Sequence, residues 1–212
     1  MTVGVYPGTF NPPTVAHLAI AEAARRQGGL DRLDLVVSTV PLGKDPTGPP
    51  LGVRLAVLEA VAASRPWLGV QITDRQLIAE VAAGYDAVVV GVDKWLQIVD
   101  PAWYGGSATA RDAAVGRLPR VLVVARPPHP LPSDLPDGSL LLEVGAAYHG
   151  VSSSAARAGR RDWMAAEAAA HDQLTGAWIA AGAGIACGPG DDEVDGGLPR
   201  PGEPPGYPRS DG

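Results

Sequence analysis

Short apolar runs alternate with amphipathic stretches along most of the chain. The runs rich in β-branched residues, which predict strands, are residues 3–6, 33–40, 70–73, 87–92, 121–125 and 140–144. The stretches with a helical pattern lie between them, at residues 14–27, 51–64, 74–83, 93–99 and 108–116. Runs that are apolar throughout are typical of parallel strands buried on both faces. The pattern therefore predicts an α/β fold with a doubly wound parallel sheet.

The C-terminal part of the chain has a different pattern. Residues 152–170 are rich in alanine and predict a helix, which residues 171–186 are expected to continue. From residue 188 onward, glycine, proline and acidic residues dominate. Such a segment buries too little apolar surface to offset its ordering entropy. We expect one α/β domain over residues 1–187 and a disordered tail over residues 188–212.

Several polar segments follow the ends of predicted strands. In doubly wound sheets, ligands bind beyond the carboxyl ends of the strands, near the point where the strand order reverses. The segments in question are residues 8–14, 41–44, 91–93 and 126–128. We expect them to meet at one edge of the sheet and to form the binding site there.

The first of these segments carries a motif for anion binding. Residues 8–17 read Gly-Thr-Phe-Asn-Pro-Pro-Thr-Val-Ala-His and lead into a predicted helix. Gly8 allows a ligand to approach the backbone closely, and Thr14 is a good N-cap residue. His17 lies three residues later and therefore shares a helix face with Thr14. Because a helix N-terminus has unpaired N–H groups and a partial positive charge, this junction predicts a phosphate site.

A second motif opens the predicted helix after the last strand. Residues 151–157 read Val-Ser-Ser-Ser-Ala-Ala-Arg. Ser153 and Ser154 lie four and three residues before Arg157, so their hydroxyls and the guanidinium can point the same way. This combination predicts a second anion clamp. Taken singly, each motif is more often a simple cap, but two of them at strand-to-helix junctions favour a shared phosphate site.

Together the two motifs resemble the signatures of the nucleotidyltransferase superfamily, Gly-(Thr/Ser)-Phe-Asp-Pro-x-(His/Thr)-x-Gly-His and Ile-Ser-Ser-(Thr/Ser)-x-x-Arg. This chain departs from the first signature at Asn11 and at Ala16, and it has Thr14 in the place of the first histidine, as some branches do. The resemblance implies a Rossmann-like nucleotidyltransferase fold that binds ATP. The ATP-binding residues implied here are Gly8, Thr9, Phe10, Thr14, His17, Ser152, Ser153, Ser154 and Arg157.

The segments between the motifs most resemble nicotinate (or nicotinamide) mononucleotide adenylyltransferases. The resemblance rests on Pro-Leu-Gly-Lys at 41–44, Val-Gly-Val-Asp at 90–93, Pro-Ala-Trp-Tyr at 101–104 and Ala-Arg-Pro at 125–127. It implies nucleotide contacts at Gly91 and Asp93. It also implies substrate binding by Lys44, Trp103, Tyr104 and Arg126, although packing is an equally good interpretation of Trp103. The catalytic residues implied are His17, Lys44 and Arg157.

The resemblance implies adenylyl transfer from ATP to a pyridine mononucleotide, with nicotinate mononucleotide preferred and pyrophosphate released. The acceptor phosphate is already ionised, so the reaction needs no general base. His17 is expected to stabilise the α-phosphate, and Arg157 with the serines to hold the leaving phosphates. Mg²⁺ is expected to bind through the ATP phosphates, because the sequence has no carboxylate cluster for a metal site of its own.

The composition of the chain limits which partners and which cellular location we expect. The net charge of −6 argues against broad binding of nucleic acid. A single cysteine, Cys187, suits a reducing cytoplasm. No run has the pattern of a signal peptide or the length of a membrane span, which favours a cytoplasmic protein without membrane contact. The family resemblance also implies a homo-oligomer.

Two other functions fit the same motifs. Thr14 and the three serines also resemble phosphopantetheine adenylyltransferase, which uses a different phosphorylated acceptor. The departures at Asn11 and Ala16 instead fit a non-catalytic module that binds a nucleotide. A dinucleotide-binding oxidoreductase is disfavoured, because no Gly-x-Gly-x-x-Gly follows the first predicted strand.

Overall fold

The computed structural model describes residues 1–40, 48–125 and 129–180. Its strands are β1 (Val3–Pro7), β2 (Arg32–Ser38), β3 (Leu68–Thr73), β4 (Ala87–Gly91), β5 (Arg120–Val124) and β6 (Leu140–Leu142). All pair in parallel in one sheet of order β3-β2-β1-β4-β5-β6. The order reverses between β1 and β4, which is where such folds bind ligands. The predicted doubly wound α/β fold is confirmed.

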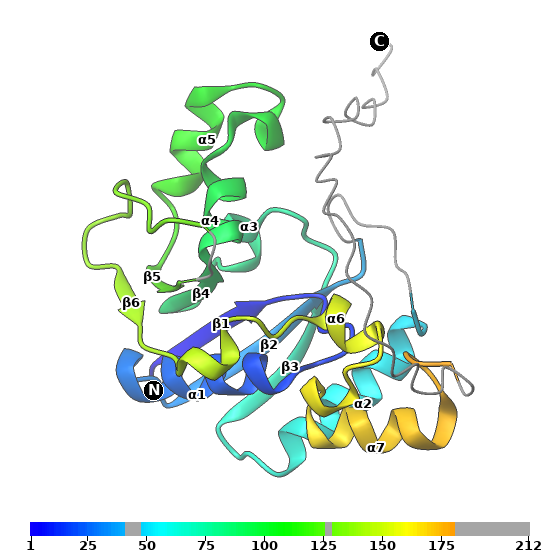
Figure 1. Cartoon of the computed structure of the whole chain (residues 1–212). Helices are drawn as coiled ribbons and strands as arrows, with labels where there is room; N and C mark the ends of the chain where they lie inside the picture. Colours follow the sequence, from blue (N-terminus) through cyan, green and yellow to red (C-terminus); the bar gives the residue numbers. More distant parts are fainter. Residues whose placement is uncertain (41–47, 126–128, 181–212) are drawn as a thin grey trace.

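Helices cover both faces of the sheet (Figure 1). One face carries α1 (Val15–Gly28), α2 (Leu51–Ala63) and α7 (Ala166–Thr175), and the other carries α3 (Ile78–Val81), α4 (Val92–Val99) and α5 (Ala108–Val115). Because side chains alternate along a strand, β1 sends Tyr6 into one core and Val5 into the other. The apolar runs therefore form a sheet buried on both faces, as their composition predicts.

Two predicted helices differ from the structure. The helix expected over 74–83 is only α3, because the Arg75 N–H bonds to the hydroxyl of Thr73 and Leu77, which precedes the helix, is extended. The helix expected over 152–170 is divided into α6 (Ser153–Arg157), the 3-10 helix η3 (Arg161–Trp163) and α7.

The division of the C-terminal helix has a clear cause. Gly159 has a φ of +121°, which ends the first helix, and Met164 is extended and forms an antiparallel bridge with Thr14. A contact far along the sequence thus overrides the local helix preference of the alanines. The predicted extension over 171–186 stops at Thr175, where Gly176 adopts the left-handed conformation with a φ of 64°.

Three predicted features lie outside the described residues. They are the Lys44 loop, the segment with Arg126, and the tail over residues 188–212. Within the described ranges, no helix combines the length and apolar character needed to cross a membrane.

Candidate functional site

A cleft of about 520 Å³ lies along the carboxyl edge of the sheet. Its lining includes the last residues of five strands, namely Pro7, Ser38, Thr73, Gly91 and Val124. Both sequence motifs also contribute to the lining, through residues of the β1–α1 loop and through residues 151–154 with Arg157. The structure therefore brings together the strand-end segments that it describes, as expected for a doubly wound sheet.

Thr14 and His17 form a reciprocal cap at the start of α1. The Thr14 hydroxyl accepts from the His17 N–H at 3.4 Å, while His17 Nδ1 accepts from the Thr14 N–H at 3.0 Å. The Thr14 hydroxyl also lies 2.8 Å from Nδ1. Because Nδ1 accepts from a main-chain N–H, the neutral imidazole carries its proton on Nε2. His17 is therefore set up as a hydrogen-bond donor in the lining of the cleft.

The ring of Phe10 packs against the ring of His17. The Phe10 side chain is 1% exposed, and its ring makes edge contacts with Tyr6 at 5.5 Å and with His17 at 5.1 Å between centroids. A Cβ at position 8 would lie 2.7 Å from the Phe10 ring, which explains why Gly8 is needed there. The Phe10 side chain is buried and is not among the residues that line the cleft, and its contact with ATP stays a prediction.

The second motif holds the first one directly. The Ser153 hydroxyl donates to the carbonyl of Pro12 at 2.8 Å. The Arg157 guanidinium donates to the carbonyl of Asn11 and, at 3.4 Å, to the hydroxyl of Ser154. A serine has a single proton to donate, so that of Ser153 already has an acceptor, whereas a guanidinium has five donors and keeps others for a ligand.

Other elements hold two further carbonyls of this loop. Arg54 of α2 is 7% exposed and donates to the carbonyl of Thr9 at 2.9 Å. Burial lowers the pKa of Arg54 from its ordinary value. The N–H of Ala165 donates to the carbonyl of Pro13 at 2.9 Å. The contact of Arg54 joins α2 to the β1–α1 loop (residues 8–14, called the phosphate loop below), and the sequence analysis did not predict it.

Ser152 acts as the cap of α6, since its hydroxyl accepts from the N–H of Ala155 at 3.1 Å. Gly91, the last residue of β4, precedes α4, and a Cβ at this position would lie 2.5 Å from a carboxylate oxygen of Asp93. Gly91 and Asp93 both line the cleft. Ser152 therefore has a structural role of its own besides its place in the lining.

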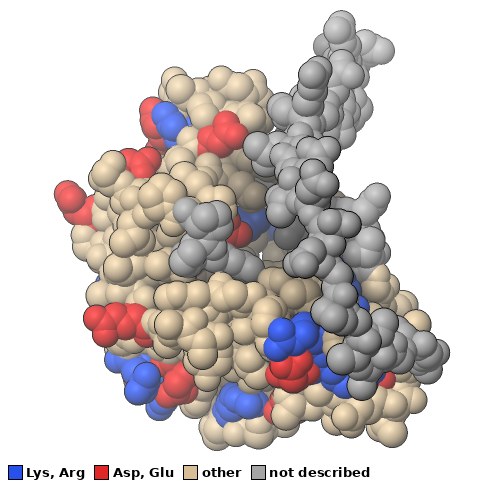
Figure 2. All heavy atoms as spheres, viewed as in Figure 1, with Lys and Arg blue, Asp and Glu red and all other residues tan. Residues whose placement is uncertain are grey.

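The described lining of the cleft is cationic. It contains the side chains of Arg75, Lys94 and Arg157 and one acidic side chain, Asp93. Elsewhere the charges are mixed: on the face shown in Figure 2, the described basic and acidic side chains are interspersed. The positive character is therefore local and suits an anionic ligand even though the chain has a net charge of −6.

Trp103 and Tyr104 lie beside the cleft rather than in it. They belong to the 3-10 helix η1 (Pro101–Tyr104) and line a second pocket of about 50 Å³. Gln76, Ile78 and Lys94 line both pockets, so the two are neighbours. The Tyr104 hydroxyl donates to the carbonyl of Ile98 at 2.9 Å, and burial raises the pKa of this tyrosine.

Sequence reasoning missed Arg75. It follows β3 by two residues, lines the cleft and donates to the carbonyl of Glu80 at 3.1 Å. The rule that ligands bind beyond strand ends, applied to β3, would have found Arg75.

His149 also lines the cleft, and its Nε2 lies 3.2 Å from the carbonyl of Val144. Among the described residues there is no group of three or more His, Cys, Asp or Glu able to hold a metal ion.

With this geometry in place, the chain can be compared with known proteins. A family model described as Cytidylyltransferase-like matches residues 5–159, and the chain belongs to this family of nucleotidyltransferases. The match spans both motifs and the sheet that positions them. The resemblance to the nucleotidyltransferase superfamily is thereby confirmed.

Two similar relatives share one name. Over 68 residues the chain is 43% identical to a probable nicotinate-nucleotide adenylyltransferase of Salinibacter ruber, which covers 31% of this chain and 34% of the relative. A protein of the same name from Bordetella pertussis is 35% identical over 68 residues, or 32% of this chain and 34% of that protein. The chain thus spans only 34% of the length of each of these relatives in the alignments.

Solved structures agree on the fold. Nicotinic acid mononucleotide adenylyltransferase of Plasmodium falciparum, complexed with NaAD, matches with a TM-score of 0.55 and 14% identity over 74% of this chain and 82% of that chain. The same enzyme complexed with APC matches with a TM-score of 0.51 and 13% identity, over the same shares of both chains. At this identity the likeness establishes the shared fold.

Proposed function

We propose that this nucleotidyltransferase transfers the adenylyl group of ATP to nicotinate mononucleotide and releases pyrophosphate, a step in NAD biosynthesis. The observation that carries the proposal is that His17 and Arg157, from two distant motifs, line one cationic cleft at the switch point of the sheet. A cleft of this kind suits a triphosphate. The relatives that align with part of the chain are named as probable nicotinate-nucleotide adenylyltransferases, which supports nicotinate mononucleotide as the acceptor.

The reaction is an in-line displacement. A 5′-phosphate oxygen of the mononucleotide attacks the α-phosphorus of ATP and forms a new phosphorus–oxygen bond. The bond from the α-phosphorus to the oxygen that bridges to the β-phosphorus breaks, and pyrophosphate leaves with that electron pair. The attacking phosphate is already ionised, so catalysis consists of positioning the reactants and stabilising charge.

His17 supplies the central interaction in this proposal. Its Nε2 proton, fixed by the contacts of Nδ1 with Thr14, donates to an α-phosphate oxygen as negative charge builds up. The positive end of α1 adds to this stabilisation. Arg157 keeps guanidinium donors beyond the one on Asn11, and these bind the β- and γ-phosphates with the hydroxyl of Ser154.

The acceptor is assigned to the β2–β3 side of the cleft. Ser38, Thr73 and Arg75 line that side, and the pocket of Trp103 adjoins it. A pyridine ring needs a flat aromatic partner, which Trp103 would supply. Arg75 would pair with a pyridine carboxylate, which favours the acid over the amide. Lys44 and Arg126 remain predicted ligands of the acceptor, outside the described residues.

Magnesium fits this site as a companion of the nucleotide. Mg²⁺ commonly uses one or two carboxylates together with substrate phosphates. Asp93 is the acidic side chain in the described lining, and no larger ligand cluster accompanies it in the described residues. When bound with ATP, the ion would neutralise phosphate charge.

The proposal is tested by supplying the purified protein with ATP, magnesium and one acceptor at a time. The acceptors are nicotinate mononucleotide, nicotinamide mononucleotide and phosphopantetheine, with no acceptor as the control. Pyrophosphate release is expected to be fastest with nicotinate mononucleotide. Faster release with phosphopantetheine would favour the alternative that Thr14 and the serine motif suggest, and ATP binding without release in any mixture would indicate a non-catalytic module.

A further inference from the structure

The side chain of Asn11 is held by a tryptophan from the far end of the described chain. Trp178 Nε1–H donates to Asn11 Oδ1 at 2.7 Å, and the two residues are only 7% and 8% exposed. The main-chain carbonyl of the same asparagine accepts from Arg157. Asn11 is thus held through its side chain by one element and through its backbone by another.

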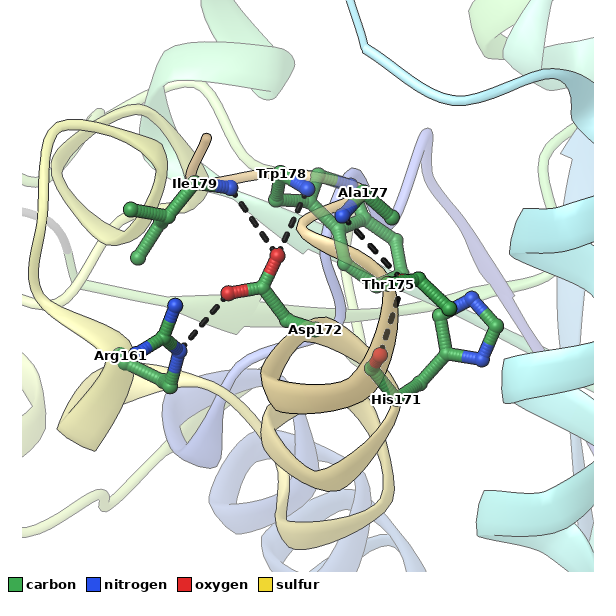
Figure 3. Close-up of polar contacts among 7 residues, drawn as sticks. All are labelled: Arg161, His171, Asp172, Thr175, Ala177, Trp178 and Ile179. Carbon is green, nitrogen blue, oxygen red and sulfur yellow. Dashed lines mark hydrogen bonds and ion pairs between the residues drawn. The ribbon is translucent and has the colours of Figure 1, made fainter. Parts of the chain in front are cut away.

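Trp178 is fixed in turn by Asp172 of α7 (Figure 3). One carboxylate oxygen of Asp172 accepts from the main-chain N–H groups of Trp178 at 2.7 Å and Ile179 at 3.0 Å. The other oxygen accepts from Nε of Arg161 at 2.8 Å. Because Asp172 is 1% exposed, these donors are what make burial of its charge tolerable.

Residues 176–179, called the strap below, link α7 to the phosphate loop. Gly176 ends α7 in the left-handed conformation, and its N–H bonds to the carbonyl of Asp172 at 2.8 Å. The rings of Trp178 and His171 make an edge contact, with 6.0 Å between their centroids. The direction in which the strap leaves the helix is therefore set by α7 itself.

The loop that the strap contacts is under strain. Phe10, next to Asn11, has a φ of +42°, a left-handed conformation that a bulky residue rarely adopts. Such conformations persist only where the surrounding structure enforces them. Trp178 provides one of these restraints, one residue away from the strained position.

We propose that Trp178 is a positioning residue, which acts through Asn11 to fix the phosphate loop and is itself held in place by Asp172. This inference rests on the proposed function. It also explains why this chain has asparagine where the superfamily signature has aspartate. The amide oxygen of Asn11 accepts the indole N–H without burying a negative charge beside the phosphate site.

A double-mutant cycle tests the coupling. Trp178→Phe removes the indole N–H and keeps most of the packing, and Asn11→Ala removes the acceptor. Each is expected to lower kcat about 10- to 100-fold, because small displacements of reacting groups are costly, while the KM for ATP changes less. The kcat of the double variant is expected to fall no further than that of the worse single variant, since both substitutions remove the same hydrogen bond.

Trp67→Phe is the matched control. Trp67 immediately precedes β3 at the amino end of the sheet, stacks with Arg25 and does not line the cleft. It is expected to keep the wild-type kcat. If Trp178→Phe behaves like Trp67→Phe, or if the losses of the double variant multiply as for independent sites, the inference is overturned.

The wild-type protein gives a second readout that needs neither turnover nor a substitution. Titration with magnesium-ATP is expected to shift the indole N–H resonance of Trp178 and to leave that of Trp67 in place. If this shift occurs but no adenylyl group is transferred to any acceptor, the proposed function fails and the coupling between Trp178 and the loop stands. An unmoved Trp178 resonance overturns the coupling, whatever the activity.

Discussion

The guanidinium of Arg157 donates a hydrogen bond to the main-chain carbonyl of Asn11, although 146 residues separate the two in the chain. The two motifs that bind phosphate in the proposed reaction are therefore parts of one structure. Ser153 reinforces the junction through the carbonyl of Pro12. A change in either motif is thus expected to affect the other, which bears on the predictions below.

His17→Ala is expected to lower kcat about 100- to 1000-fold, the usual cost of losing one preorganised donor to developing charge. His17 is half-buried in the first turn of α1, so the variant is expected to fold. Steady-state kinetics measure the loss, and circular dichroism checks the fold. His129→Ala, a change at an exposed histidine outside the cleft lining, is the control. Equal turnover of both variants would remove His17 from the mechanism.

Trp103→Ala is expected to raise the KM for nicotinate mononucleotide about tenfold, because the pyridine ring loses its aromatic partner. The KM for ATP in the same experiments is the internal control and is expected to stay the same. Trp103 lines the small pocket beside the cleft, so an unchanged KM for the mononucleotide would assign it to packing against its neighbours.

Arg75→Gln is expected to reduce the preference for the acid acceptor. The ratio of kcat/KM for nicotinate over nicotinamide mononucleotide should fall about tenfold, since a charge-assisted pair with the carboxylate is lost and the amide forms no such pair. Arg26→Gln makes the same change of charge at the end of α1, outside the cleft lining, and should leave the ratio unaltered. A ratio that does not respond to Arg75→Gln would refute carboxylate recognition by this residue.

Asp172→Asn is expected to destabilise the protein at neutral pH by about 1 to 3 kcal/mol, the cost of buried donors left poorly paired. Burial alone would raise the pKa of Asp172, but the N–H groups of Ile179 and Trp178 and the guanidinium of Arg161 outweigh it and hold the pKa below its ordinary value of 3.8. The carboxylate therefore stabilises the fold above that value, and the contribution is lost as pH falls through the lower pKa of the folded state.

Urea unfolding of the wild type and Asp172→Asn from pH 7 downward measures this effect. The difference in the free energy of unfolding between the two proteins should be largest near neutral pH. It should shrink as the pH falls below the ordinary pKa of 3.8. Asp162→Asn, at an exposed carboxylate that pairs with Arg160, is the control and should show little difference at any pH. A gap that widens on acidification would contradict the assignment.

The sequence predicted the strands well because their apolar runs are continuous, but their ends depend on pairing. The strand expected over 70–73 begins at Leu68, since Leu68 pairs with Leu33 of β2. The prediction of a long C-terminal helix was wrong. The helix preference of alanine is local, whereas the bridge between Met164 and Thr14 joins distant segments. Local patterns thus give the elements, and long-range contacts decide where they end.

The same distinction holds for the candidate site. The motif residues Thr14, His17 and Arg157 line the cleft, because a parallel sheet brings its strand ends to one edge. Their supports were not predictable in this way. Arg54 and Trp178 reach the phosphate loop from elements whose position follows only from the packed fold.

Adenylyl transfer itself is tested most directly by following labelled ATP with nicotinate mononucleotide and magnesium. With label on the α-phosphate, we expect it in a dinucleotide with the mass of nicotinate adenine dinucleotide. With label on the γ-phosphate, we expect it in pyrophosphate, in an amount equal to the dinucleotide. Label from the γ-phosphate in inorganic phosphate or on the acceptor, with no labelled dinucleotide from the α-phosphate, would contradict cleavage between the α- and β-phosphates and with it the proposed function.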